Sequence, residues 1–203
     1  MESKTDVKNI SEKAIKDEKL LSKLLEEILS KEDEVRFNSF RILMQISEDY
    51  PVALYPKWDF LADLLDSDNH YRRFIAINLL ANLATIDTKN KFEKTFDRYF
   101  SQIDGDRTMV AGQAVLNSGK VAKAIPNLQT KITNKLLNID KTHHGKQTDL
   151  MKAYAIEAFD EYFEEASDKE KILDFVKIQL ESKSPKARKA AKEFLKRWGN
   201  EFN

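Results

Sequence analysis

Hydrophobic positions recur at helical spacing along almost the whole chain. The clearest series runs through Ile125, Leu128, Ile132 and Leu136, which lie three or four positions apart and therefore share one face of a helix. No stretch alternates with a period of two for long enough to indicate a β-strand. The pattern predicts an all-α protein of about ten helices, with a shorter helix leading at residues 6–16.

Residues that favour helix ends fall between these hydrophobic stripes. Ser184 followed by Pro185 is typical of an N-cap with proline in the first turn. Ser118-Gly119 predicts the end of a helix, and residues 138–147 form the longest predicted loop. The chain has only five glycines and four prolines. Because turns depend on these residues, their scarcity favours long helices with few connections.

The segments that open every second predicted helix resemble one another. Aligned on Val35, Tyr71, Met109, Leu150 and Ala187, they recur after 36, 38, 41 and 37 residues. A period of this length, built from two helices, is typical of α-solenoid repeats. One helix pair cannot bury its apolar faces on both sides, so neighbouring pairs must stack to complete the core.

These repeats resemble those of the HEAT-like family of armadillo/HEAT-type α-solenoids. The resemblance rests on the segment from Asp33 to Arg36, which small and apolar residues follow, and on its echo from Asp68 to Arg72. It extends over residues 18–198, although valine and methionine take the arginine position in the third and fourth repeats.

The resemblance implies a right-handed α-solenoid, an α–α superhelix of about five helix pairs. It also implies a single repeat domain over residues 1–203. The repeats are expected at about residues 18–50, 56–86, 89–118, 125–165 and 168–198. Solenoids of this family mostly bind other macromolecules, so the expected function is that of a non-catalytic binding scaffold.

Composition limits the chemistry that the chain can perform. The absence of cysteine excludes disulfides, thiolate metal sites and a cysteine nucleophile. Of the three histidines, the adjacent His143 and His144 have no established metal spacing, so neither a metal nor a cofactor is expected. No apolar run approaches the roughly 20 residues of a membrane span, and the polar first residues do not suggest a signal peptide. We therefore expect a cytoplasmic protein with no membrane contact and no small-molecule substrate.

Polar side chains recur on the predicted second helices of the repeats and make these helices the first candidate binding surface. Amide side chains on one face of successive helices suit the recognition of a peptide backbone, so the expected partner is a protein or peptide. The same residues could instead be solvent-facing amides without a special role. The candidates are Asn38, Arg41, Gln45, Asn78, Asn82, Gln113 and Asn117.

Arginine recurs at one position of the repeat, at Arg36, Arg72 and Arg188. The structural interpretation is a ladder in which each arginine pairs with acidic residues of the adjacent inter-helix turn. The functional interpretation is anion binding. A repeated position favours repeated architecture, and thus the ladder.

The alternative function is nucleic-acid binding through a basic C-terminal end. The candidate patch comprises Lys183, Lys186, Lys189, Lys192, Lys196 and Arg197. Phosphate contacts require such clusters. However, an acidic stretch over residues 157–168 precedes the patch, and the chain balances 34 basic against 34 acidic side chains. The competing interpretation is a solvated cap in which neighbouring helices pair their charges.

A third hypothesis is a HEAT-like DNA glycosylase. That family uses a concave pocket of aromatic and acidic residues, for which Trp58 and Asp59 are the candidates here. Both lie on a first helix of a repeat, whereas the concave face usually comes from second helices. The neutral net charge also opposes this hypothesis, so no enzymatic activity is expected.

The neutral chain with a locally basic end generates the first prediction. Binding of duplex or single-stranded oligonucleotides should be weak, with a Kd of about 10⁻⁴ M or poorer at physiological salt, and should fade steeply as salt rises. Reversing Lys186, Lys189 and Lys192 to glutamate should abolish it. Titration of labelled oligonucleotides checks this, and saturable sub-micromolar binding would make nucleic acid the leading hypothesis.

Overall fold

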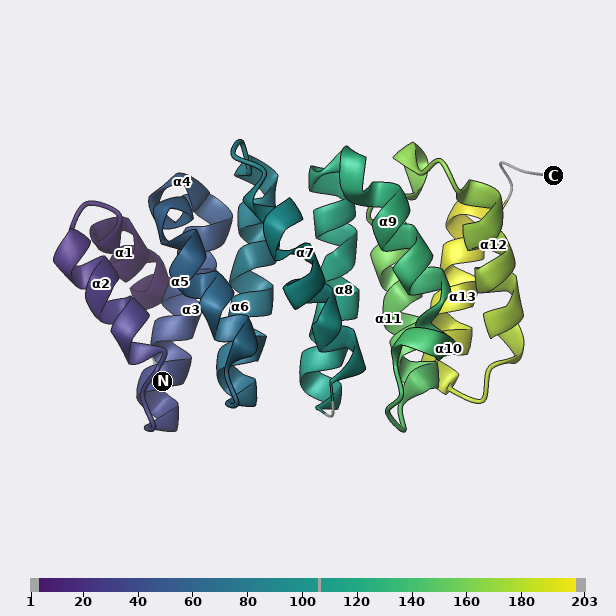
Figure 1. The fold of residues 1–203 in the computed structure, drawn as a ribbon, viewed down its shortest axis with the longest axis horizontal. Coiled ribbons are helices and arrows are strands. Elements are labelled where there is room, and N and C mark those ends of the chain that lie inside the picture. The colour runs from purple at the N-terminus through teal and green to yellow at the C-terminus, as the bar shows by residue number, and fades with distance from the viewer. Residues whose placement is uncertain (1–3, 106, 200–203) are drawn as a thin grey trace. The chain divides into compact units, whose positions relative to one another are not determined.

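A computed structural model describes residues 4–105 and 107–199 of the chain, and within these ranges every regular element is a helix. The chain divides into two compact units, Met1–Thr95 and Phe96–Asn203. Figure 1 shows the order of the helices along the chain.

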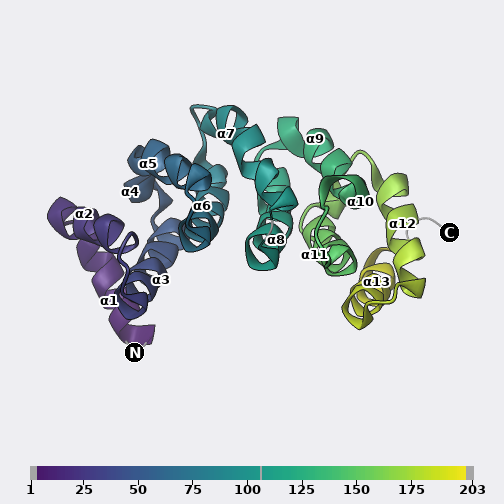
Figure 2. The same ribbon diagram turned by 60° about the horizontal axis from the view of Figure 1, so that its bottom comes forward.

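The first unit consists of helices stacked in two layers. Figure 2 shows α1, α3 and α6 on one side of this unit and α2, α4 and α5 on the other. Short 3₁₀ turns follow α4, α5 and α6 directly. The helices are α1 (Lys4–Ala14), α2 (Glu18–Glu27), α3 (Asp33–Asp49), α4 (Pro51–Leu54), α5 (Trp58–Asp63), α6 (His70–Leu83) and the beginning of α7 (Lys91–Ser101), which crosses into the second unit.

The second unit repeats the same plan. The helices α8, α11 and α13 form one layer, in which α11 packs against both α8 and α13, while α9 and α12 belong to the other layer (Figure 2). The short α10 occupies part of the segment 138–147 that the sequence predicts as loop. The helices are α8 (Thr108–Ala124), α9 (Pro126–Leu137), α10 (Ile139–Thr142), α11 (Thr148–Asp160), α12 (Lys169–Ile178) and α13 (Pro185–Trp198).

The helix ends agree with the sequence in one place and contradict it in another. Ser184 caps α13 as predicted, because its hydroxyl accepts a hydrogen bond from the backbone N–H of Ala187 at 3.3 Å. The predicted helix end at Ser118-Gly119 is wrong, since both residues lie inside α8. A Cβ on Gly119 would stand 2.4 Å from the carbonyl oxygen of Ala158. Glycine here allows α8 to approach α11 closely, so it serves packing rather than termination.

The helix α6 is buried far more completely than an amphipathic surface helix. In α6, every residue from Ile75 to Leu83 is buried, although two of them are asparagines. This helix packs against α3 on one side and against α5 and its following turn on another. Neighbouring elements therefore enclose α6, and the helix needs a nearly continuous apolar sequence rather than a single stripe.

The core assignment generates a stability prediction. Leu79 is fully buried and Leu128 is 5% exposed. Replacing either leucine by alanine should lower the free energy of unfolding by about 2–5 kcal/mol, because the cavity left behind cannot fully collapse. Urea titration measures the change, and Val52→Ala is the control because Val52 is 74% exposed. Losses below about 0.5 kcal/mol for both leucines would contradict the assignment.

Candidate binding surfaces

The recurrent arginines hold the turns that precede the second helices. Arg36 donates to the carbonyl of Ser30 at 2.9 Å and pairs with the carboxylate of Asp33. Arg72 reaches back across the repeat and donates to the carbonyl of Leu29 at 3.0 Å. These side chains therefore satisfy carbonyl groups left open just beyond the C-terminus of α2.

Arg188 plays the same part in the second unit. Its guanidinium donates to the carbonyls of Ser182 and Lys183 at 2.6 and 3.1 Å. The arginines thus form a structural ladder, but the expected acidic partners are wrong for Arg72 and Arg188, which bind backbone oxygens instead. A sequence shows repeated arginines but cannot distinguish a carboxylate from a turn carbonyl as their acceptor.

Two of the candidate asparagines are enclosed between helices of the first unit. Asn82 is 6% exposed and donates to the hydroxyl of Ser47 at 2.9 Å, which ties α6 to α3. Asn78 is equally buried and donates to the carbonyl of Phe74, one turn earlier, at 2.7 Å. Their amides serve the packing of the fold and present little surface to a partner.

The other candidates on the second helices differ in exposure. Asn38, Arg41 and Gln45 lie half-buried on α3, where Gln45 donates to Asp49 at 2.8 Å. On α8 of the second unit, Gln113 is half-buried and Asn117 is buried. The partner-binding role of the seven residues stays a prediction, and three of the four half-buried members lie on α3.

Exposed aromatic side chains lie on the same helices and were missed by the sequence analysis. Phe37 on α3 is 52% exposed and Tyr71 on α6 is 42% exposed. The guanidinium of Arg36 stacks over Tyr71 at 4.5 Å, and that of Arg41 lies over Phe37 at 5.9 Å. We call Phe37, Asn38, Arg41 and Tyr71 the α3–α6 surface.

The periodicity of α3 contains the signal that reveals Phe37. Ile42, Leu43 and Ile46 are buried and define the core side of the helix. Phe37 stands about five residues before Ile42, which at 3.6 residues per turn places it on the far side. An aromatic residue outside the core stripe could therefore have been found from the sequence.

Two cations of the basic C-terminal end pair with acidic residues of the helix beside it. Lys186 on α13 forms an ion pair with Glu157 on α11 at 3.1 Å and lies 4.0 Å above the ring of Tyr154. Arg197 pairs with Asp160, whose other oxygen accepts a hydrogen bond from the indole of Trp198 at 2.7 Å. The acidic stretch that precedes the patch in sequence thus faces it in space.

The remaining cations of this patch are exposed to solvent. Lys189 pairs within its own helix with Glu193 at 3.8 Å. Lys183, Lys192 and Lys196 are exposed, and their ammonium groups have no ion-pair partner among the residues that the structure describes. The arrangement fits the interpretation of a solvated, internally paired cap.

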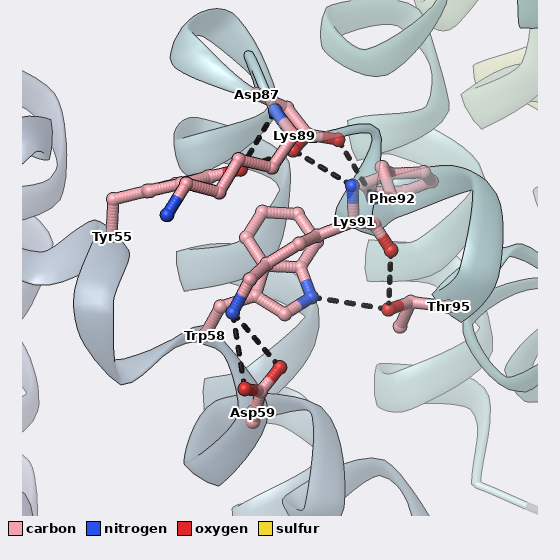
Figure 3. Close-up of polar contacts among 8 residues, drawn as sticks. All are labelled: Tyr55, Trp58, Asp59, Asp87, Lys89, Lys91, Phe92 and Thr95. Carbon is pink, nitrogen blue, oxygen red and sulfur yellow. Dashed lines mark hydrogen bonds and ion pairs between the residues drawn. The ribbon is translucent and has the colours of Figure 1, made fainter.

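The two residues considered for a glycosylase pocket instead take part in polar contacts between α5 and α7, which we call the clasp. Trp58 is 1% exposed, and its indole donates to the hydroxyl of Thr95 at 3.1 Å (Figure 3). The ammonium of Lys91 bridges both carboxylate oxygens of Asp59 at 3.0 and 3.1 Å. These contacts join α5 to α7.

Asp87 organises the other half of this clasp. It accepts hydrogen bonds from the backbone N–H groups of Lys91 and Phe92 at 2.9 and 2.7 Å, and so caps α7 (Figure 3). The hydroxyl of Tyr55 donates to the same carboxylate at 2.5 Å. Burial, together with the hydrogen bond to Asp87, raises the pKa of Tyr55 to about 12.

The adjacent histidines fasten a loop of the second unit. His143 is 3% exposed, and its Nδ1 donates to the carbonyl of Ile103 at 2.8 Å. His144 lies 2.6 Å from Asp104, and this hydrogen bond lowers the pKa of the carboxyl. In the described ranges no three His, Asp or Glu side chains form a group that could hold a metal ion.

Comparison with known proteins identifies the fold through solved structures. It finds no relative by sequence. No family model matches the chain, and no curated protein matches it. A designed armadillo repeat protein aligns over 95% of this chain and 91% of its own, with a TM-score of 0.56 and 14% identity. An engineered protein aligns over 97% of this chain and 90% of its own, with a TM-score of 0.54 and 15% identity.

At such low identity the likeness shows the fold alone. The chain has an armadillo/HEAT-like repeat fold, and the prediction of an all-α solenoid is confirmed. Within the described part of the chain, no helix is both long enough and apolar enough to cross a membrane.

The Tyr55–Asp87 hydrogen bond generates a pH prediction. The raised pKa means that the folded state holds the phenol proton more tightly than the unfolded state, whose tyrosine titrates near pH 10. The stabilisation is therefore complete below about pH 10 and is lost as pH rises toward about 12. Tyr55→Phe should cost about 1 kcal/mol at neutral pH.

Urea titrations of wild type and Tyr55→Phe at neutral pH and near pH 11 test this. The difference between the two proteins should shrink as pH rises. Burial also raises the pKa values of Tyr99 and Tyr162, so both proteins should lose stability in alkali. A difference that stays constant with pH would contradict the assigned role of the Tyr55 proton.

Proposed function

We propose that this protein is a non-catalytic scaffold that binds another protein or a peptide through the second helices of its repeats, with the α3–α6 surface at the centre of the contact. The observation that carries the proposal is the exposure of Phe37 and Tyr71 beside arginine on two neighbouring helices. The fold supports the proposal because solenoids present extended binding surfaces.

The composition of this surface is that of an interface. Aromatic residues and arginine are enriched among the residues that dominate binding energy. Arg36 is itself 8% exposed and holds the face of Tyr71 in place, while Arg41 lies beside Phe37. Phe40 and Phe74 meet edge to face between the same two helices, with ring centroids 5.8 Å apart, and so support the surface from below. Rings that are already fixed lose little conformational entropy when a partner binds.

The competing functions lack comparable support. Nucleic-acid binding would have to use a patch in which Lys186, Lys189 and Arg197 are paired with carboxylates. The glycosylase hypothesis would require Trp58 and Asp59 to be available, and both are engaged in the clasp. We therefore retain the non-enzymatic scaffold.

The proposal predicts that replacing the two exposed aromatic side chains abolishes binding of the partner. The double variant Phe37→Ser, Tyr71→Ser should fold, because the two side chains are 52% and 42% exposed and lie outside the core. It should nevertheless lose its partner in affinity capture from a lysate of the source organism. Quantitative mass spectrometry of the captured proteins, for wild type and variant in parallel, gives the readout.

The matched control is the double variant Val52→Ser, Ile178→Ser, which removes two side chains that are 74% and 71% exposed on other elements. This control should retain every protein that wild type captures. Equal recovery by the Phe37→Ser, Tyr71→Ser variant, with unchanged helical content by circular dichroism, would contradict the proposal.

A further inference from the structure

A cavity of about 290 Å³ lies among α1, α2 and α3 of the first unit. This volume is at the lower end of the range for ligand pockets. Most of its wall is aliphatic and comes from all three helices. The aliphatic residues are Ile10, Leu20, Leu24, Val35 and Ile42.

The charged groups in the wall cancel one another. The hydroxyl of Ser39, which is 3% exposed, donates to the carboxylate of Glu27 at 2.6 Å. The ammonium of Lys23 lies 3.6 Å from the other oxygen of that carboxylate. A charged guest would have to break this arrangement, whereas a neutral guest leaves it intact. The charges of the wall therefore favour an uncharged, apolar occupant.

Asn38 connects the cavity to the proposed binding surface. It lines the cavity, is half-buried, and follows the exposed Phe37 directly in α3. Its side-chain amide has no hydrogen-bond partner among the residues that the structure describes. An amide offers one acceptor and two donors, the combination that can pair with the N–H and C=O of a peptide group.

We infer that the cavity is an anchor pocket, in which a peptide segment of the protein partner places a neutral aliphatic side chain while Asn38 pairs with its backbone. This inference rests on the proposed function and specifies the class of partner. The anchor is a leucine, isoleucine, valine or methionine side chain flanked by uncharged residues. Its burial against the aliphatic wall supplies the affinity, and Asn38 fixes the direction of the chain.

Selection from a phage-displayed library of random linear peptides tests this inference without knowledge of the natural partner. Wild type should select sequences that share one aliphatic residue in an uncharged setting. The affinity of a synthetic consensus peptide is then measured by fluorescence polarisation. Val35→Phe, which places a ring in the cavity, should weaken binding about tenfold or more, as expected when an aliphatic anchor is lost.

The matched control is Val52→Phe, the same substitution at a 74% exposed position of the first unit, which should leave the affinity unchanged. Asn38→Ala provides a second test in case Val35→Phe disturbs the fold, and it should also weaken the peptide. Replacing the anchor of the peptide by alanine or by lysine should have the same effect as filling the cavity.

Several results would overturn the inference. One is the selection of peptides without an aliphatic anchor. Another is an affinity that neither Val35→Phe nor Asn38→Ala changes. The third is failure to select any peptide. Peptides that bind but respond only to Phe37→Ser, Tyr71→Ser would refute the anchor pocket and leave the proposed function standing. Loss of peptide binding in the Val52→Phe variant alone would refute both the anchor pocket and the proposed function.

Discussion

The fold depends on the enclosure of the second helices by their neighbours. A helix such as α6, with an unbroken buried segment from Ile75 to Leu83, has no stable surroundings in a single helix pair. Its stability comes from α3 on one side and from α5 on the other. The same requirement explains Gly119, where even one methyl group would collide with the backbone of α11. Close packing of this layer thus constrains residue size at positions that have no other evident purpose.

The same enclosure determines which surfaces remain for function. Buried polar groups on these helices must find partners inside the protein, as Asn82 does at Ser47. Only residues outside the core stripe can meet another molecule, and on α3 these include Phe37, Asn38 and Arg41. The exposed rings are informative because each lies beside an arginine guanidinium, a combination that is enriched in interfaces.

Helix positions and the repeat could be predicted from the sequence because apolar periodicity follows directly from burial. The location of polar side chains could not. Asn38 and Asn82 look alike in sequence, yet one lies beside a cavity and the other is buried between helices, because this depends on which neighbour stands opposite. The prediction of a helix end at Ser118-Gly119 was wrong for a similar reason. A glycine can end a helix or admit a neighbouring backbone, and only the tertiary contact decides.

Contacts between repeats occur at sequence separations close to the repeat period, and this explains the charge pattern of the C-terminal end. Arg197 and Asp160 are 37 residues apart, and Asn82 and Ser47 are 35 apart. In an ordinary globular fold, an acidic block followed by a basic one could be separated by the whole domain. In a solenoid, helices one period apart lie side by side, so such blocks face each other and pair. Charge alternation at the repeat period thus indicates cohesion between repeats.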